Sequence, residues 1–169
     1  MPEATQREIA SQLPSPIPGR PVVADKWHFT LRFLGATDAG ARARLSEALA
    51  AAPLGNPFDI GFSGLGAFPS AGRARVLWVG VKSGKEELEG LARKVEEALK
   101  AVGFAPEPRP FKAHLTLSRI QPASSVRMTI ARGRDVRGSM RVDSVILFRS
   151  HLGRGGSRYE IVERFPLKR

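Results

Sequence analysis

Three stretches of the chain carry apolar residues at the spacing of an amphipathic helix. In residues 85–103 the apolar positions recur every three or four residues and a glycine comes last, which predicts a helix that ends there. Residues 39–51 form a second predicted helix, with Asp38 as its N-cap. A shorter helix is predicted over residues 2–13, before a proline-rich loop at 14–21 that cannot continue it.

Elsewhere the pattern is that of β-strands. Residues 58–68 alternate and contain several glycines, whereas residues 74–82 are almost continuously apolar, and both are predicted strands. Residues 139–150 and 157–164 are predicted to form a final hairpin around the turn Gly-Arg-Gly-Gly. The mixed order of helices and strands predicts an α+β fold with largely antiparallel sheets.

Two further predicted strands, at 27–34 and 111–120, carry the same four-residue pattern. Each contains histidine, an apolar residue, threonine and leucine in that order, beginning at His28 and at His114 (114 − 28 = 86 positions apart). The chain has only 3 histidines, 5 threonines and 16 leucines. Two such copies would arise by chance with a probability on the order of 10⁻⁵, so the repeat indicates a function.

The alternation of side chains along a strand predicts how these residues are presented. His28 and Thr30 would share one face of their strand, and His114 and Thr116 one face of theirs. The pKa of imidazole is ordinarily about 6.5, so near neutral pH one histidine can be protonated while the other is neutral. The protonated ring can then act as general acid and the neutral ring as general base. Threonine hydroxyls can donate hydrogen bonds to phosphoryl oxygens.

A zinc site is not predicted, because no third histidine or carboxylate lies at metal-ligand spacing from the two motifs. The remaining histidine, His151, stands in a predicted loop without a motif around it, and we interpret it as a surface residue. We therefore expect the chemistry to need no metal and no cofactor.

The charge of the chain points to a polyanionic partner. Lysine and arginine number 27 against 16 acidic residues, a net charge of +11, which favours nucleic acid; solubility alone is the other interpretation. The chain has no cysteine, which excludes disulfides and is typical of a reducing compartment. Its polar start is unlike a secretory signal, and no apolar run reaches the roughly 20 residues of a membrane span. We expect a cytoplasmic protein.

The paired motifs resemble those of the two-histidine phosphoesterase superfamily. Within it they resemble the bacterial and archaeal RNA 2′,3′-cyclic phosphodiesterases, also called LigT or ThpR proteins or 2′-5′ RNA ligases. Residues 19–35 and 109–119 are similar to the two motif regions of that branch, and residues 153–167 to its terminal hairpin. The resemblance implies one α+β domain over residues 1–169, with two similar lobes of antiparallel sheets and helices around a central cleft that carries both His-x-Thr motifs.

The resemblance also implies an activity, which is the metal-independent hydrolysis of RNA 2′,3′-cyclic phosphate ends to 2′-phosphomonoesters. His28 would be the proton donor to the leaving 3′-oxygen and His114 the proton acceptor that activates water, with Thr30 and Thr116 completing the catalytic motifs. The substrate would be RNA with a cyclic phosphate end or a cyclic nucleotide, and the protein is expected to be a monomer.

Three further residues are assigned to substrate binding by the resemblance. Phe33 would stack on the terminal base, Arg119 would bind phosphate, and Arg158 would help to line the cleft. Phe33 and Arg119 each lie five residues after a motif histidine, so strict alternation would place them on the opposite face unless a bulge or twist shifts the strand. Phe33 could equally be a core residue.

One feature departs from the family, which usually opens with an apolar strand before its first helix. Either that strand is missing here, or residues such as 21–24 take its place at the edge of the sheet. Two other functions stay open from the sequence. The same acid–base pair would serve 2′-5′ ligation of a cyclic phosphate to a 5′-hydroxyl, and the chain could be a non-catalytic RNA-binding module, although its four motif residues are intact.

Overall fold

The computed structural model describes residues 1–153 and 156–168 of the chain. These residues group into two compact units, each assembled from three separate segments. Unit 1 consists of Met1–Phe29, Asp59–Glu86 and Lys112–Arg141, and unit 2 of Thr30–Phe58, Glu87–Phe111 and Val142–Arg169. The chain therefore passes from one unit to the other next to each of the two motifs, after Phe29 and after Phe111.

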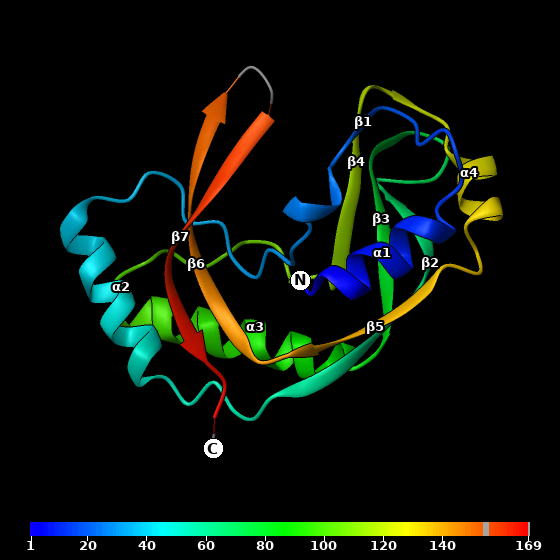
Figure 1. Ribbon diagram of the computed structural model, residues 1–169. Coiled ribbons are helices and arrows are strands. Elements are labelled where there is room, and N and C mark those ends of the chain that lie inside the picture. The colour runs from blue at the N-terminus through cyan, green and yellow to red at the C-terminus, as the bar shows by residue number, and fades with distance from the viewer. Residues whose placement is uncertain (154–155, 169) are drawn as a thin grey trace. The chain divides into compact units, whose positions relative to one another are not determined.

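Unit 1 is built on a five-stranded sheet in the order β1-β4-β3-β2-β5 (Figure 1). The strands are β1 (Arg20–Pro21), β2 (Phe58–Phe68), β3 (Ala74–Ser83), β4 (His114–Ser124) and β5 (Arg137–Val142). Within the part β1-β4-β3-β2, each strand runs antiparallel to its neighbours. One face of the sheet is core, where Leu77, Val79 and Leu115 are fully buried.

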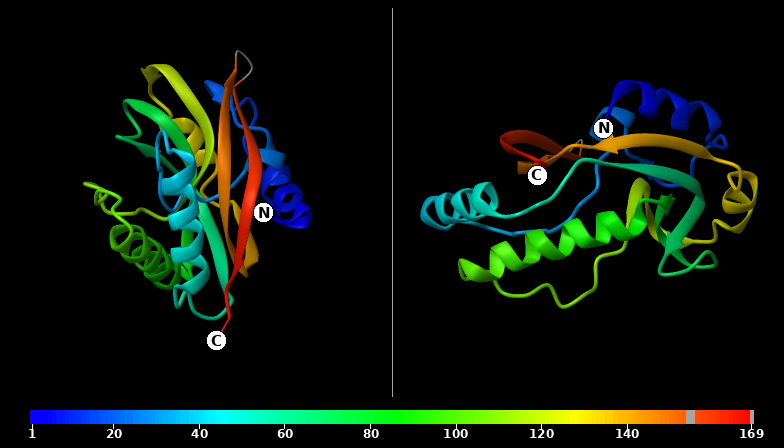
Figure 2. Two further views of the ribbon diagram at one scale, coloured as in Figure 1. Left: turned by 90° about the vertical axis from the view of Figure 1, so that its left-hand side faces the viewer. Right: turned by 90° about the horizontal axis from the view of Figure 1, so that it is seen from below.

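Two α-helices and a short 3₁₀ helix complete unit 1. α1 (Glu3–Gln12) lies along the edge strand β5, as the right-hand view of Figure 2 shows. The hydroxyl of Thr5 donates to the carbonyl of Ser139 at 2.8 Å, and Ile9 is fully buried against Gly138. The 3₁₀ helix η1 (Ala24–Lys26) comes just before the first motif, and α4 (Arg127–Arg132) follows β4.

Unit 2 combines two helices with a β-hairpin. α2 (Ala39–Ala51) begins at Asp38, whose side chain accepts a hydrogen bond from the backbone N–H of Ala41 at 2.8 Å. α3 (Lys85–Ala101), most of which belongs to this unit, ends before Gly103, which adopts a φ of +91° that favours glycine. The hairpin consists of β6 (Ser144–Gly153) and β7 (Gly156–Pro166), which run side by side in Figure 1.

The structure confirms most of the predicted elements, including the α+β class with antiparallel sheets. The predicted helices and the strands at 58–68 and 74–82 are present, within two residues of the expected ends. The second motif strand begins at His114, three residues later than predicted. Arg154 and Gly155, in the predicted turn of the final hairpin, lie outside the described residues. The short helix α4 was not predicted.

The single strand predicted at 139–150 is wrong, because it is two strands that belong to different sheets. Asp143 separates β5 from β6. Its carbonyl accepts a hydrogen bond from the backbone N–H of Leu167, and its carboxylate one from the hydroxyl of Ser144, both at 2.7 Å. Two consecutive polar residues, Asp143 and Ser144, interrupt the alternation at this corner, but no glycine or proline marks the change of partner.

The strand predicted at 27–34 is also wrong, since these residues join no sheet. The edge position beside β4 is already taken by Arg20 and Pro21, and the backbone N–H of Val22 donates to the carbonyl of Leu117 at 2.8 Å. The turn of η1 then leads the chain away from that edge. Two of the residues expected at this edge, 21 and 22, thus lie there.

We predict that Leu77→Ala destabilises the protein by about 2–5 kcal/mol, because this side chain on the central strand β3 is fully buried and its loss leaves a cavity. Val23→Ala is the matched control, since Val23 is 57% exposed and should change stability by less than about 0.5 kcal/mol. Urea unfolding of both variants measures the difference. Equal effects of the two substitutions would contradict the position of the core.

Candidate active site

The two motif histidines have the same local structure. Nδ1 of His28 lies 2.8 Å from the carbonyl oxygen of Lys26, and Nδ1 of His114 lies 2.6 Å from that of Lys112. A backbone carbonyl can only accept a hydrogen bond, so Nδ1 is the protonated nitrogen in each neutral ring. Nε2 then carries the lone pair in both neutral rings. The sequence analysis did not foresee this contact, which reaches back two residues in each motif.

The local supports of the two histidines nevertheless differ. His114 is the first residue of strand β4, whereas His28 follows η1 in a segment without a β-ladder. On either side of His28 an aromatic residue anchors the backbone. Trp27 is buried and its Nε1 donates to the carbonyl of Val22 at 2.9 Å, while Phe29 stacks on Phe62 with 5.8 Å between ring centroids.

Both histidines belong to unit 1, but their threonines do not share this placement. Thr116 lies in unit 1 on β4, while Thr30 is the first residue of unit 2. For the second motif, strand alternation places His114 and Thr116 on one face, opposite Gly80 and Trp78 of β3. His28 and Thr30 of the first motif lie outside any strand, so alternation does not place them on a common face.

Two aromatic side chains, Phe68 and Trp78, pack against the ring of His114 and form an aromatic wall beside it. Phe68 of β2 meets the imidazole at 5.0 Å and Trp78 of β3 at 6.4 Å, both in T-shaped geometry. The ammonium of Lys112 lies 5.6 Å above the ring of Phe68. Gly66 makes room for the wall, because a Cβ there would lie 2.1 Å from the indole of Trp78. A glycine inside a strand often marks such a close approach, and the glycines of residues 58–68 were the available signal.

A β-bulge shifts strand β4 between Thr116 and Arg119. Thr116 pairs with Trp78, but the next residue of β3, Leu77, pairs with Ser118, so two residues oppose one. Arg119 then pairs with Val76. Because residues directly opposite one another share a face, Arg119 returns to the face of His114 and Thr116. Arg119 lies five residues after His114, so a bulge was needed to bring the two to one face, and this bulge is present.

The candidate residues of unit 2 are solvent-exposed. Phe33 is 72% exposed, so the alternative of a core phenylalanine is wrong. Its neighbour Arg32 fixes this segment, because its guanidinium bonds the carboxylate of Glu107 at 2.8 Å and the carbonyl of Ala105 at 2.5 Å. Arg158 is exposed on β7, opposite His151 of β6.

The prediction that His151 lies in a loop is wrong, because this residue lies in strand β6. Its side chain is exposed, as expected. Its Nε2 is 2.9 Å from a carboxylate oxygen of Glu160 on β7. This hydrogen bond lowers the pKa of Glu160 below its ordinary value, with smaller contributions from nearby arginines. His151 thus bonds a side chain of the neighbouring strand of its own hairpin.

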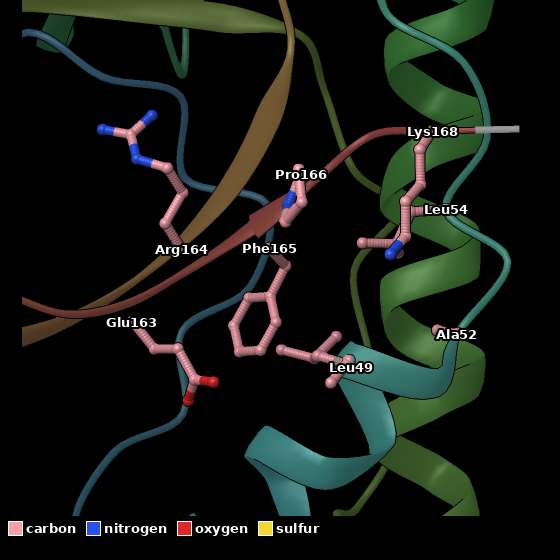
Figure 3. A pocket seen from close by; sticks show the side chains of 9 residues that line it. Leu49, Ala52, Leu54, Glu163, Arg164, Phe165, Pro166 and Lys168 are labelled. Carbon is pink, nitrogen blue, oxygen red and sulfur yellow. The ribbon is translucent and has the colours of Figure 1, made fainter.

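A small pocket in unit 2, of about 160 Å³, lies between the end of α2 and the end of β7. Leu49, Phe165 and Leu54 form its apolar part, and Glu163, Arg164 and Lys168 stand around it (Figure 3). It is smaller than the roughly 300–1,000 Å³ of ordinary ligand sites. None of the candidate site residues lines it, so it adds nothing to the chemistry of the motifs.

Within residues 1–153 and 156–168, no three histidine, cysteine or carboxylate side chains are grouped so that they could hold a metal ion. In the same part of the chain, no helix has the length and apolar character needed to cross a membrane.

Comparison with protein families gives a clear match. A model of the family described as LigT-like phosphoesterase matches residues 1–78 and again residues 79–159. Each matched range contains one of the two histidine motifs. The match covers most of the chain and joins both motifs in one family.

Curated relatives and solved structures agree with this match. The RNA 2′,3′-cyclic phosphodiesterase of Aeropyrum pernix is 37% identical over 148 residues, covering 85% of this chain and 84% of that protein. The enzyme of the same name from Escherichia coli is 33% identical over 153 residues, covering 90% and 82%. The crystal structure of E. coli LigT complexed with 3′-AMP is similar over all of this chain and 94% of that one, with a TM-score of 0.77 and 27% identity.

We predict that Gly66→Ala displaces the indole of Trp78, because the added Cβ would overlap the ring. Such overpacking should cost about 1–3 kcal/mol and change the tryptophan fluorescence. Gly40→Ala in α2 is the control, since its Cβ would meet no atom closer than 3.4 Å, and it should leave both readouts nearly unchanged. Urea unfolding followed by fluorescence measures both effects. A normal spectrum and stability for Gly66→Ala would mean that the indole does not cover this glycine.

Proposed function

The chain belongs to the LigT-like phosphoesterase family, and on that premise we propose that it hydrolyses RNA 2′,3′-cyclic phosphate ends to 2′-phosphomonoesters with a pair of histidines. The observation that carries this proposal is the common arrangement of His28 and His114. In each, a backbone carbonyl accepts from Nδ1–H, which assigns proton transfer to Nε2. Two imidazoles prepared in this way supply an acid and a base without further groups.

The reaction balances with these two groups and one water molecule. Nε2 of His114 takes a proton from water while the water oxygen forms a bond to phosphorus. The bond between phosphorus and the 3′-oxygen breaks, and protonated His28 donates its proton to that oxygen. The phosphate stays on the 2′-oxygen, and the two histidines end with their protonation states exchanged. Proton exchange with solvent restores the starting pair.

The remaining motif residues would hold the phosphate. The hydroxyl of Thr116 lies on the same strand face as His114, which suits donation to a non-bridging oxygen whose charge grows in the transition state. Thr30 would do the same beside His28. Arg119 shares the face of His114 through the bulge, which supports a contact with a phosphate of the RNA chain.

The substrate is proposed to be RNA with a cyclic phosphate end. The net charge of +11 supports a polyanion, and the exposed ring of Phe33 is suited to stacking on a base without reading its sequence. Arg158 adds an exposed positive charge on β7. No membrane partner is proposed, and the protein is expected to act as a monomer.

We predict that hydrolysis of an oligonucleotide 2′,3′-cyclic phosphate continues at an unchanged rate in excess EDTA. The reason is that the two imidazoles already provide the acid and the base, so no metal-bound water is required. The rate is measured before and after chelation and dialysis. Activity that disappears in EDTA and returns with one divalent ion would refute the metal-independent mechanism.

His28→Ala and His114→Ala are each expected to lower kcat/KM by at least about 10²-fold, because each removes one proton-transfer group. The double variant should lose far less than the product of the two, since the residues act as a unit. The wild type should show a bell-shaped dependence of kcat/KM on pH, and each single variant should lose one limb.

His151→Ala is the matched control for these variants, because His151 is an exposed histidine bonded to Glu160. It should keep the rate and the pH profile of the wild type. A folded His28→Ala or His114→Ala protein with near-normal turnover would show that the paired mechanism is wrong.

A further inference from the structure

Two arginines lie directly opposite each other at the edge of the unit 1 sheet. Arg20 of β1 pairs with Arg119 of β4, and both side chains are exposed. Like charges in direct cross-strand register destabilise a sheet. In the described part of the chain neither arginine has a carboxylate within ion-pair distance. The pair therefore places two positive charges together without an internal counter-charge.

Several contacts fix the backbone around Arg20 in this position. Gly19 has a φ of +82°, and a Cβ there would lie 2.5 Å from the carbonyl oxygen of Arg119. The fully buried hydroxyl of Ser118 donates to the carbonyl of Pro18 at 2.6 Å. On the other side of Arg20, the N–H of Val22 donates to the carbonyl of Leu117 at 2.8 Å. The two-residue strand is thus held on both sides, and the place of Arg20 beside Arg119 is fixed.

The arginine pair points to the face of the sheet that carries the second motif. Arg119 lies opposite Val76, which shares a face of β3 with Trp78, the partner of Thr116. Because directly paired residues share a face, Arg20 joins Arg119, Thr116 and His114 on this side. Both arginines are therefore on the face where the phosphate would be processed.

We propose that Arg20 and Arg119 together bind the phosphodiester on the 5′ side of the reacting cyclic phosphate, so that Arg20 is a binding residue for RNA chains. This inference rests on the proposed function. The two guanidinium groups can surround one phosphate with charge-assisted hydrogen bonds, which removes the repulsion between them. Because of the bulge, Arg119 lies four β3 residues beyond His114, which is about 13 Å along the sheet at roughly 3.3 Å per residue. That separation favours the next phosphate of the chain over the one at His114.

The other explanation of Arg20 is that it only discourages strand addition at an exposed sheet edge, as charged residues often do. The two explanations differ in how substrates of different length respond. A mononucleotide 2′,3′-cyclic phosphate carries only the reacting phosphate, whereas a trinucleotide with the same end also carries internal phosphodiesters. Only the second substrate can use the arginine pair as proposed.

The experiment compares Arg20→Ala with Arg75→Ala on both substrates. Arg75 is an exposed arginine on β3, so its loss removes the same charge from the same sheet. We expect Arg20→Ala to raise KM for the trinucleotide about tenfold and to leave kcat/KM for the mononucleotide unchanged. The slope of log KM against log salt should fall by about one. Arg20→Lys should recover part of the loss, and Arg75→Ala should change neither substrate.

Three results would overturn the proposal, namely no effect of Arg20→Ala on the trinucleotide, an equal loss with the mononucleotide, or an equal loss in Arg75→Ala. Thermal unfolding of each variant shows whether it folds. If Arg20→Ala does not fold, Arg20→Lys replaces it in the comparison with Arg75→Ala. Binding of a trinucleotide that ends in a 2′-phosphate is measured in parallel by titration. If the wild type turns over neither substrate, the proposed function fails, while the binding comparison still decides the role of Arg20.

Discussion

The antiparallel pairing of β4 with β3 determines where the candidate groups of the second motif lie. It places His114 opposite Gly80 and Thr116 opposite Trp78, and its bulge returns Arg119 to the same face. Without the bulge, the arginine would point into the core face that Leu77 and Leu115 occupy. A single irregularity in the ladder thus allows a buried apolar face and a polar reactive face to share one strand.

The two histidines reach the same chemical state by different structural routes. His114 is positioned by a strand and an aromatic wall, while His28 follows a 3₁₀ turn and lies between two anchored aromatic residues. In both, the carbonyl two residues earlier accepts from Nδ1–H. This hydrogen bond selects the same tautomer in both rings, which is the tautomer that the proposed acid and base require.

The sequence predicted well those features that depend on local pattern. The spacing of apolar residues identified α3, and the side chain of Asp38 identified the start of α2. The repeated motif indicated two histidines, and the structure gives both the same local contact. The prediction from sequence failed where the structure of a segment depends on which strand occupies a given edge of the sheet. Residues 27–34 have the composition of a strand, yet Arg20 and Pro21 already occupy the place beside β4.

Parts of the site were beyond prediction for the same reason. The wall of Phe68 and Trp78 around His114 exists only because β2, β3 and β4 align in one register, which no single segment encodes. The pairing of Arg20 with Arg119 joins residues 99 positions apart (119 − 20 = 99). Similarly, the corner at Asp143 separates two strands that belong to different sheets, and no glycine or proline marks it in the sequence. Non-local pairing decides these features.

The central claim is that one histidine protonates the 3′-oxygen while the other activates water. The most direct measurement is product analysis by ³¹P NMR of an oligonucleotide 2′,3′-cyclic phosphate hydrolysed in ¹⁸O-labelled water. The account predicts a single product, the 2′-phosphomonoester, with one ¹⁸O atom on its phosphorus. A 3′-phosphomonoester, or a mixture of the two isomers, would contradict the fixed roles of the two histidines.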